Sequence, residues 1–206
     1  MNEDVITIGD KSRAKRQMIW FHGYGANNWS FEPTMKLLNL NLDEKLYIIM
    51  PNAPVMGDKR SWYPLPQEIN GEVIEDDVGI DLSKDMFCDA IQKFINPSKK
   101  IILGGFSQGA AFSMYIGLNN FIPCSHIISI GGYIPSAKKI NFSSNNKKVY
   151  ISHGRNDTTI SIDTHRKSIE CLEKNNQDYH EFIDDCGHTI SKPMIDDLTD
   201  WIYKIT

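Results

Sequence analysis

Long apolar runs, cysteine motifs and clusters of basic residues are all scarce in this sequence of 206 residues. No apolar run approaches the roughly 20 residues that a membrane helix requires, and the first 17 residues contain no apolar segment typical of a signal peptide. The four cysteines lie far apart without C-x-x-C spacing, so they indicate neither a disulfide framework nor a zinc site. These absences predict a cytoplasmic protein with no stable membrane insertion.

The charge balance argues against nucleic-acid binding. The formal net charge is −4, and the largest basic cluster is the short run KSRAKR near the N-terminus. A hydrophobic content of 41% and a charged content of 23% are typical of a globular protein that buries its own core. We therefore predict a single domain over residues 1–206, without a linker or an internal repeat.

Short β-rich runs alternate along the chain with amphipathic segments. The run DVITI predicts an edge strand, and six further strands are predicted at Met18–Phe21, Leu46–Met50, Lys100–Leu103, His126–Ile130, Val149–Ser152 and Tyr179–Ile183. Runs such as KIILGG are apolar without clean alternation, which is typical of parallel strands covered on both faces.

Helical spacing of apolar residues occurs between these strands. A helix is predicted where Leu82, Met86, Ala90 and Phe94 recur every four residues, and another where Met194, Leu198 and Ile202 do so. A third begins at Ser161, a typical N-cap residue. The alternation predicts a three-layer α/β sandwich with a mostly parallel sheet.

The segment GFSQG at residues 105–109 follows an apolar strand and precedes a predicted helix. A serine at such a turn is either a helix cap or a nucleophile held at a sharp elbow, and small neighbours favour the elbow. The glycine spacing fits neither G-x-G-x-x-G nor the phosphate loop G-x-x-x-x-G-K-[ST], so phosphate binding is the lesser alternative. Ser107 is therefore the candidate nucleophile.

A serine nucleophile requires a histidine base and an acid that orients it, in the chain order Ser, Asp, His for this kind of sheet. His188 lies in a loop between the last predicted strand and the last helix, whereas His165 and His180 fall within regular elements. Asp157 follows the strand before that, where an Asx-turn is its alternative role, and Asp163 is its competitor.

Acyl transfer also requires N–H donors for the oxyanion. One donor is expected at Gln108, directly after the candidate nucleophile, and a second at Tyr24 between two glycines of the loop HGYG. His22 is a possible base or metal ligand by residue type, but its place beside this turn favours a packing role.

Five segments in this order resemble the phospholipase/carboxylesterase family of small α/β-hydrolases, which includes the acyl-protein thioesterases. They are FHGYGAN (21–27), PNAP (51–54), GFSQGAA (105–111), SHGRND (152–157) and GH (187–188). The resemblance covers nearly the whole chain and implies an α/β-hydrolase fold with helices on both faces and no large cap domain. It also implies that Ser107, Asp157 and His188 form the catalytic triad, and that the Tyr24 and Gln108 amides form the oxyanion hole.

Further expectations follow from the same resemblance. The segment RSWYPL (60–65) is similar to a family loop that lines the acyl site, which makes Trp62 a candidate substrate-binding residue, with packing on the domain as the alternative. Ala26 and Asn27 stand where the thioesterase branch usually has aspartate after its HGLG motif, and this form is closer to bacterial esterases. No metal or cofactor is implied, and a homodimer is common among relatives.

The sequence thus predicts a serine carboxylesterase for esters or thioesters with short to medium acyl chains. Lysophospholipase and acyl-protein thioesterase activities are the alternatives within the enzyme class, with a small-molecule or lipid acyl ester as substrate. A non-catalytic binding protein on a hydrolase fold is the alternative from another class, although such proteins typically lose one of the three catalytic residues.

Overall fold

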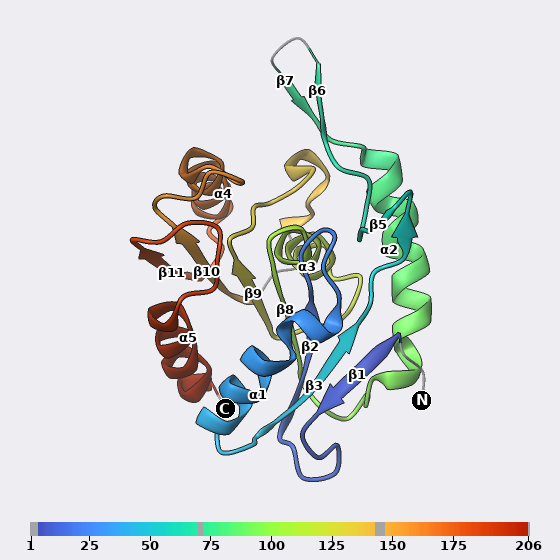
Figure 1. Ribbon diagram of the computed structural model, residues 1–206, viewed down its shortest axis with the longest axis vertical. Coiled ribbons are helices and arrows are strands. Elements are labelled where there is room, and N and C mark those ends of the chain that lie inside the picture. Colours follow the sequence, from blue (N-terminus) through green and yellow to red (C-terminus); the bar gives the residue numbers. More distant parts are fainter. Residues whose placement is uncertain (1–3, 70–71, 143–146, 206) are drawn as a thin grey trace.

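A seven-stranded sheet runs through the centre of the molecule (Figure 1). The computed structural model describes residues 4–69, 72–142 and 147–205. The strand order is β1-β3-β2-β8-β9-β10-β11, in which β1 is antiparallel to β3 and the other neighbours are parallel. These strands are β1 Val5–Ile8, β2 Arg16–Phe21, β3 Leu46–Pro51, β8 Ile101–Phe106, β9 His126–Ile130, β10 Lys148–Gly154 and β11 Tyr179–Asp184.

The predicted strands are all present in this sheet. β9 has the predicted bounds, whereas β8 continues through Phe106 instead of ending at Leu103. Two glycines lie in this extension, and a Cβ atom at Gly104 would come within 3.1 Å of the Trp20 ring. Glycine therefore lets β8 pass close to β2 before the chain reaches Ser107.

Helices cover both faces of the sheet (Figure 1). Met18 and Trp20 of β2 pack in one core with α1 (Glu32–Asn41) and α5 (Lys192–Ile205), whereas Ile19 and Phe21 pack with α2 (Asp77–Ile91) and α3 (Gln108–Leu118). A third cluster joins α3 and α4 (Ile162–Lys174) to β9 and β10. The predicted three-layer α/β fold with a mostly parallel sheet is confirmed.

Two predicted helices have the expected details. The Ser161 hydroxyl accepts a hydrogen bond from the Thr164 N–H at 3.2 Å and caps α4. Met194, Leu198 and Ile202 are fully buried along α5. Their spacing places them on one face of the helix, which packs against the sheet.

The predicted helix around Leu82 exists as α2, but its buried face differs from the expected one. Leu82 is 61% exposed and Met86 is 70% exposed, while Ile80, Phe87 and Ile91 pack on the sheet side. Apolar residues lie on two faces of α2, so the spacing of apolar residues alone predicted the wrong face as the buried one. Phe94 lies beyond α2, in a 3₁₀ turn over Gln92–Phe94.

Two short hairpins and a short connection complete the chain. The hairpins are β4–β5 (Val55–Met56 and Lys59–Arg60) and β6–β7 (Gln67–Ile69 and Glu72–Ile74), and the second projects away from the body (Figure 1). Between β9 and β10 the described residues include a 3₁₀ turn over Ala137–Lys139 but no α-helix or strand, in keeping with a fold without a cap domain. Among the described helices, none is long and apolar enough to cross a membrane.

Candidate active site

Ser107 occupies a sharp turn between the end of β8 and the start of α3. Its backbone angles are φ 57° and ψ −123°, which residues with a side chain rarely adopt. Its N–H donates to the Ile130 carbonyl oxygen at 3.0 Å, and its carbonyl oxygen accepts from the Ala111 N–H at 3.0 Å. Backbone strain held in place by its surroundings in this way is typical of functional sites.

The glycines that flank Ser107 are required by close backbone contacts. A Cβ atom at Gly105 would lie 2.5 Å from the carbonyl carbon of Gly109, and one at Gly109 would lie 2.3 Å from the Phe21 carbonyl oxygen. Real Cβ atoms do not approach backbone atoms so closely, so neither site accommodates a larger residue. The G-x-S-x-G spacing therefore forms a nucleophile elbow rather than a simple helix cap.

A continuous hydrogen-bonded chain links Ser107, His188 and Asp157. The Ser107 Oγ lies 2.9 Å from His188 Nε2, and His188 Nδ1 lies 2.6 Å from Asp157 Oδ2. Because an ionised carboxylate only accepts hydrogen bonds, Nδ1 carries the imidazole proton and Nε2 is free to accept from the serine hydroxyl. The loops after β8, β10 and β11 thus bring together the three residues that the sequence singled out.

Asp157 is held as a buried carboxylate. Its side chain is 1% exposed, and its Oδ1 accepts hydrogen bonds from the backbone N–H groups of Thr159 at 2.8 Å and Ile160 at 2.9 Å. Burial alone would raise the pKa of this carboxyl, but the bonds from His188, Ile160 and Thr159 outweigh it and hold the pKa below its usual value. Asp157 therefore stays charged and keeps the proton of His188 on Nδ1.

The competing residues lie elsewhere. Asp163 is in the first turn of α4, where its exposed carboxylate pairs with Arg166 at 2.8 Å. His165 contacts Glu181 at 2.8 Å and His180 contacts Asp197 at 2.9 Å. None of these side chains joins the chain that contains Ser107.

The two predicted oxyanion donors flank the elbow. Gln108 is the first residue of α3, and the loop that carries Tyr24 passes so close that a Cβ atom at Gly23 would lie 3.4 Å from the Ser107 Cβ. Within the described part of the chain, neither the Tyr24 nor the Gln108 backbone N–H donates to a protein acceptor. The absence of a protein acceptor is what an oxyanion hole requires of its donors, and the assignment of these two N–H groups to one stays a prediction.

His22 stabilises the turn that carries Tyr24. The side chain is 1% exposed, and burial lowers its pKa to about 4, so the ring is neutral at physiological pH. Its Nδ1–H donates to the Gly23 carbonyl oxygen at 2.8 Å, and its Nε2 accepts from the Ala53 N–H at 3.0 Å. With both ring nitrogens engaged, His22 has the packing role that the sequence favoured.

The side chain of Gln108 fastens the 61–63 loop to the elbow, a link that sequence reasoning missed. Its Oε1 accepts from the Trp62 N–H at 3.0 Å, and its Nε2 donates to the Ser61 hydroxyl at 2.9 Å and to the Tyr63 carbonyl oxygen at 2.8 Å. The Trp62 Nε1–H in turn donates to the His22 carbonyl oxygen at 2.7 Å. The loop thus braces both segments that carry the candidate oxyanion donors.

Trp62 is a buried brace in this structure. The side chain is 2% exposed. Its ring stacks on the Phe112 ring with 5.6 Å between the ring centroids, and it meets the Phe21 ring edge-on with the centroids 4.9 Å apart. It borders a hollow of about 500 Å³ between the β4–β5 hairpin and α2, whose lining includes Phe87 and Ala90 but none of the triad. Trp62 therefore has the packing contacts that the alternative interpretation expects, and its contact with substrate stays a prediction.

Replacing Trp62 tests this assignment. We expect Trp62→Ala to destabilise the fold by about 3–5 kcal/mol, because a fully buried ring is lost and the His22 carbonyl oxygen loses its donor. The loss in kcat/KM should be the same for short and long acyl esters. The measurement is a thermal melt beside an ester series, and a deficit in kcat/KM that grows with acyl length at unchanged stability would favour contact of Trp62 with the substrate.

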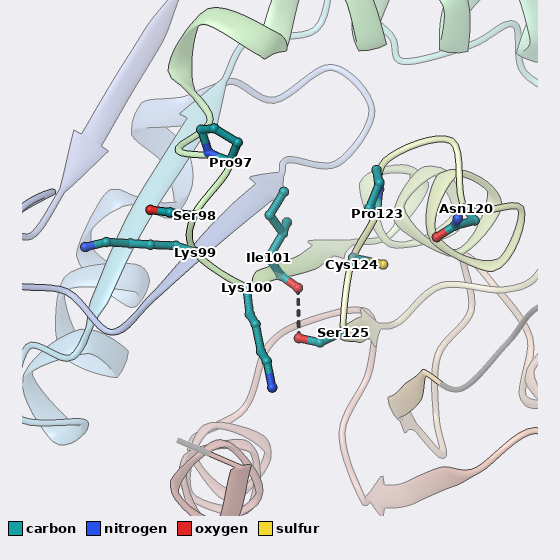
Figure 2. A pocket seen from close by; sticks show the side chains of 9 residues that line it. All are labelled: Pro97, Ser98, Lys99, Lys100, Ile101, Asn120, Pro123, Cys124 and Ser125. Carbon is teal, nitrogen blue, oxygen red and sulfur yellow. Dashed lines mark hydrogen bonds between the residues drawn. The ribbon is translucent and has the colours of Figure 1, made fainter.

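Two other hollows differ in their distance from the triad. A hollow of about 190 Å³ is lined by His188 together with Ser30, Phe31, Thr34, Phe106, Thr189 and Ile190. Another, of about 380 Å³, lies where β8 begins, around Ile101, Lys100 and Ser125 (Figure 2). Of these two hollows, only the first is lined by a residue of the triad, His188.

A comparison with protein families identifies the chain. The model of the phospholipase/carboxylesterase family matches residues 2–206, which is nearly the whole sequence. The chain belongs to this family. Its members are serine carboxylic ester hydrolases, which include carboxylesterases and acyl-protein thioesterases, so this protein is an enzyme of the esterase and thioesterase class.

Individual relatives resemble the chain over almost their full length. The acyl-protein thioesterase 1 of Yarrowia lipolytica is 26% identical over 96% of this chain and 95% of the relative. The crystal structure of Zea mays acyl-protein thioesterase 2 superposes with a TM-score of 0.81 at 19% identity, covering 97% of both chains. The Bacillus cereus carboxylesterase also gives a TM-score of 0.81, at 16% identity, covering 98% of this chain and 94% of its own. The α/β-hydrolase fold without a cap is thereby confirmed.

Proposed function

We propose that this protein hydrolyses carboxylic esters or thioesters of short to medium acyl chains through a Ser107–His188–Asp157 triad. The observation that carries the proposal is the unbroken chain of hydrogen bonds, 2.9 Å from Ser107 to His188 and 2.6 Å from His188 to Asp157. A non-catalytic binding protein would have no need of this arrangement on a strained elbow.

The geometry supports a two-step mechanism. Ser107 Oγ attacks the acyl carbonyl carbon while His188 Nε2 takes the hydroxyl proton, and the N–H groups of Tyr24 and Gln108 stabilise the oxyanion. His188 then returns the proton to the leaving oxygen or sulfur, which leaves an acyl-enzyme on Ser107. Water attacks this ester with His188 again as base, and the carboxylic acid departs. Throughout, Asp157 holds the imidazole orientation and stabilises the imidazolium.

The hollow beside His188 supports small acyl groups as substrates. Its volume of about 190 Å³ is below the roughly 300–1,000 Å³ of sites that enclose drug-sized ligands. Phe31, Phe106 and Ile190 give it apolar walls. A short or medium chain can bury its methylene groups there, whereas a long chain would extend into solvent.

The acyl-length profile tests this proposal. With p-nitrophenyl esters, kcat/KM should rise by up to about fourfold for each added methylene that becomes buried, since each is worth about 0.8 kcal/mol. We expect the rise to end at medium chain length and palmitoyl esters to react more slowly. A continued rise through palmitoyl would contradict the preference for short to medium chains.

The names of the relatives support thioesters as a second candidate substrate class. The Yarrowia and maize proteins are named acyl-protein thioesterases, although each shares 26% identity or less with this chain. The test compares kcat/KM for an octanoyl ester with kcat/KM for the corresponding octanoyl thioester. Because both substrates carry the same acyl chain, a difference between them reflects the oxygen or sulfur of the scissile bond. A clear preference in kcat/KM for the sulfur ester would favour the thioesterase alternative.

A further inference from the structure

A pair of buried histidines lies behind Asp157 and takes no part in the mechanism above. The rings of His153 and His165 lie 4.9 Å apart, and neither side chain is exposed. Burial lowers the pKa of both imidazoles, so both rings are neutral at physiological pH. His153 is the penultimate residue of β10, directly before the loop that carries Asp157.

His153 has a defined proton position. Its Nε2 lies 2.8 Å from the carbonyl oxygen of Ile160, and because a carbonyl only accepts, Nε2 carries the proton and donates. In the described part of the chain, its buried Nδ1 has no hydrogen-bond partner. The same Nε2 is 3.5 Å from Asp157 Oδ2, the oxygen that contacts His188. The ring therefore directs its one N–H at the Asp157 loop.

Ile160 connects His153 to the triad acid. Its N–H donates to Asp157 Oδ1 at 2.9 Å, while its carbonyl oxygen accepts from His153. The carbonyl and the N–H of Ile160 belong to neighbouring peptide planes that meet at its Cα atom, so a bond that anchors the carbonyl restricts the movement of the residue whose N–H is one of the two amides that bind Oδ1. With Oδ1 held in this way, the other oxygen of the carboxylate is left facing His188.

We propose that His153 is a positioning residue for the triad, which acts by anchoring Ile160 so that Asp157 Oδ2 stays directed at His188 Nδ1. This inference rests on the proposed function, because it takes Asp157 to be the acid of a working triad. The His153 Nε2–H group also lies close to Asp157 Oδ2, with 3.5 Å between the nitrogen and the oxygen, and a positive N–H dipole at this distance favours the negative charge of the carboxylate. His153 itself does not touch the reacting atoms.

Two substitutions separate this role from simple packing. His153→Phe keeps an aromatic ring but removes the donor, whereas His153→Gln keeps an amide N–H at nearly the place of Nε2. If His153 only packs, His153→Phe should retain more kcat than His153→Gln. If His153 is a positioning residue, His153→Gln should retain more kcat than His153→Phe.

His165→Phe is the matched control. His165 is as deeply buried in the same pair, but its Nε2 contacts Glu181 at 2.8 Å and not the Asp157 loop. Both Phe variants should lose thermal stability. We expect His153→Phe to lower kcat about tenfold to a hundredfold at nearly constant KM, because Ile160 loses its anchor. His153→Gln should recover most of kcat, and His165→Phe should retain wild-type kcat.

Equal kcat values for His153→Phe and His165→Phe, or no recovery with His153→Gln, would overturn the proposal. If His153→Phe does not fold, His153→Asn replaces it, since its shorter amide cannot reach Ile160 and should show the same loss relative to His153→Gln. Failure of the proposed function is distinguishable, because the wild-type enzyme would then turn over neither esters nor thioesters.

Discussion

The Ser107→Ala variant is expected to lose about 10⁶-fold in kcat while it keeps the fold and most of its substrate affinity. In the proposed mechanism the Ser107 Oγ forms the covalent bond to the acyl group, and alanine leaves His188 without a hydroxyl to deprotonate. Residual turnover of about 10³–10⁴ over water can persist, since the oxyanion donors and the substrate contacts remain. The measurement is kcat on a p-nitrophenyl ester beside the melting temperature.

A second serine gives the control for this experiment. Ser98 lies before β8, at the opposite end of that strand from the elbow, and its hydroxyl contacts Asn96 at 2.7 Å on the surface. Ser98→Ala should retain wild-type kcat. A Ser107→Ala enzyme that keeps more than about 1% of wild-type activity would show that another nucleophile carries the reaction.

The second large effect is expected for Asp157→Asn, with a loss of about 10⁴-fold in kcat. The amide oxygen can still accept from the Thr159 and Ile160 N–H groups, which turns the amide NH₂ toward His188. His188 Nδ1 must then accept, so the imidazole proton moves to Nε2 and points at Ser107. In this tautomer His188 cannot take the serine proton.

Asp163→Asn makes the same chemical change at an exposed position in the first turn of α4. It should leave kcat unchanged, and ¹⁵N NMR of the imidazole should detect the altered tautomer in Asp157→Asn alone. If Asp157→Asn lowers kcat by less than about tenfold, the assignment of Asp157 as the triad acid is contradicted.

Much of this architecture was predictable from local patterns. The strands read from β-rich runs all form the sheet, and central strands such as β8 and β9 are the clearest, because parallel strands buried on both faces carry continuous apolar segments. The candidates Ser107, Asp157 and His188 followed from the G-x-S-x-G turn and from the chain order Ser, Asp, His that this kind of sheet requires. The glycines around Ser107 encode contacts that no other residue permits.

One helix was missed although local signals for it exist. α1 was not identified, but Pro33 in its first turn and the spacing of Met35 and Leu38 indicate a helix. Other features depend on tertiary contacts and were not predictable. The burial of Trp62 depends on the Gln108 carboxamide, which is 46 residues away in sequence. His153 was passed over because its role arises from Ile160, whose backbone position no side-chain pattern reveals.

The central claim is that Ser107 is an activated nucleophile, and a fluorophosphonate probe tests it most directly. The probe reacts with a serine that a neighbouring base has activated, and mass spectrometry of the digested adduct locates the modified residue. We predict a single adduct on Ser107 in the folded wild-type enzyme and none in Ser107→Ala. An adduct on any other residue, or no adduct on folded wild-type protein, would contradict the account.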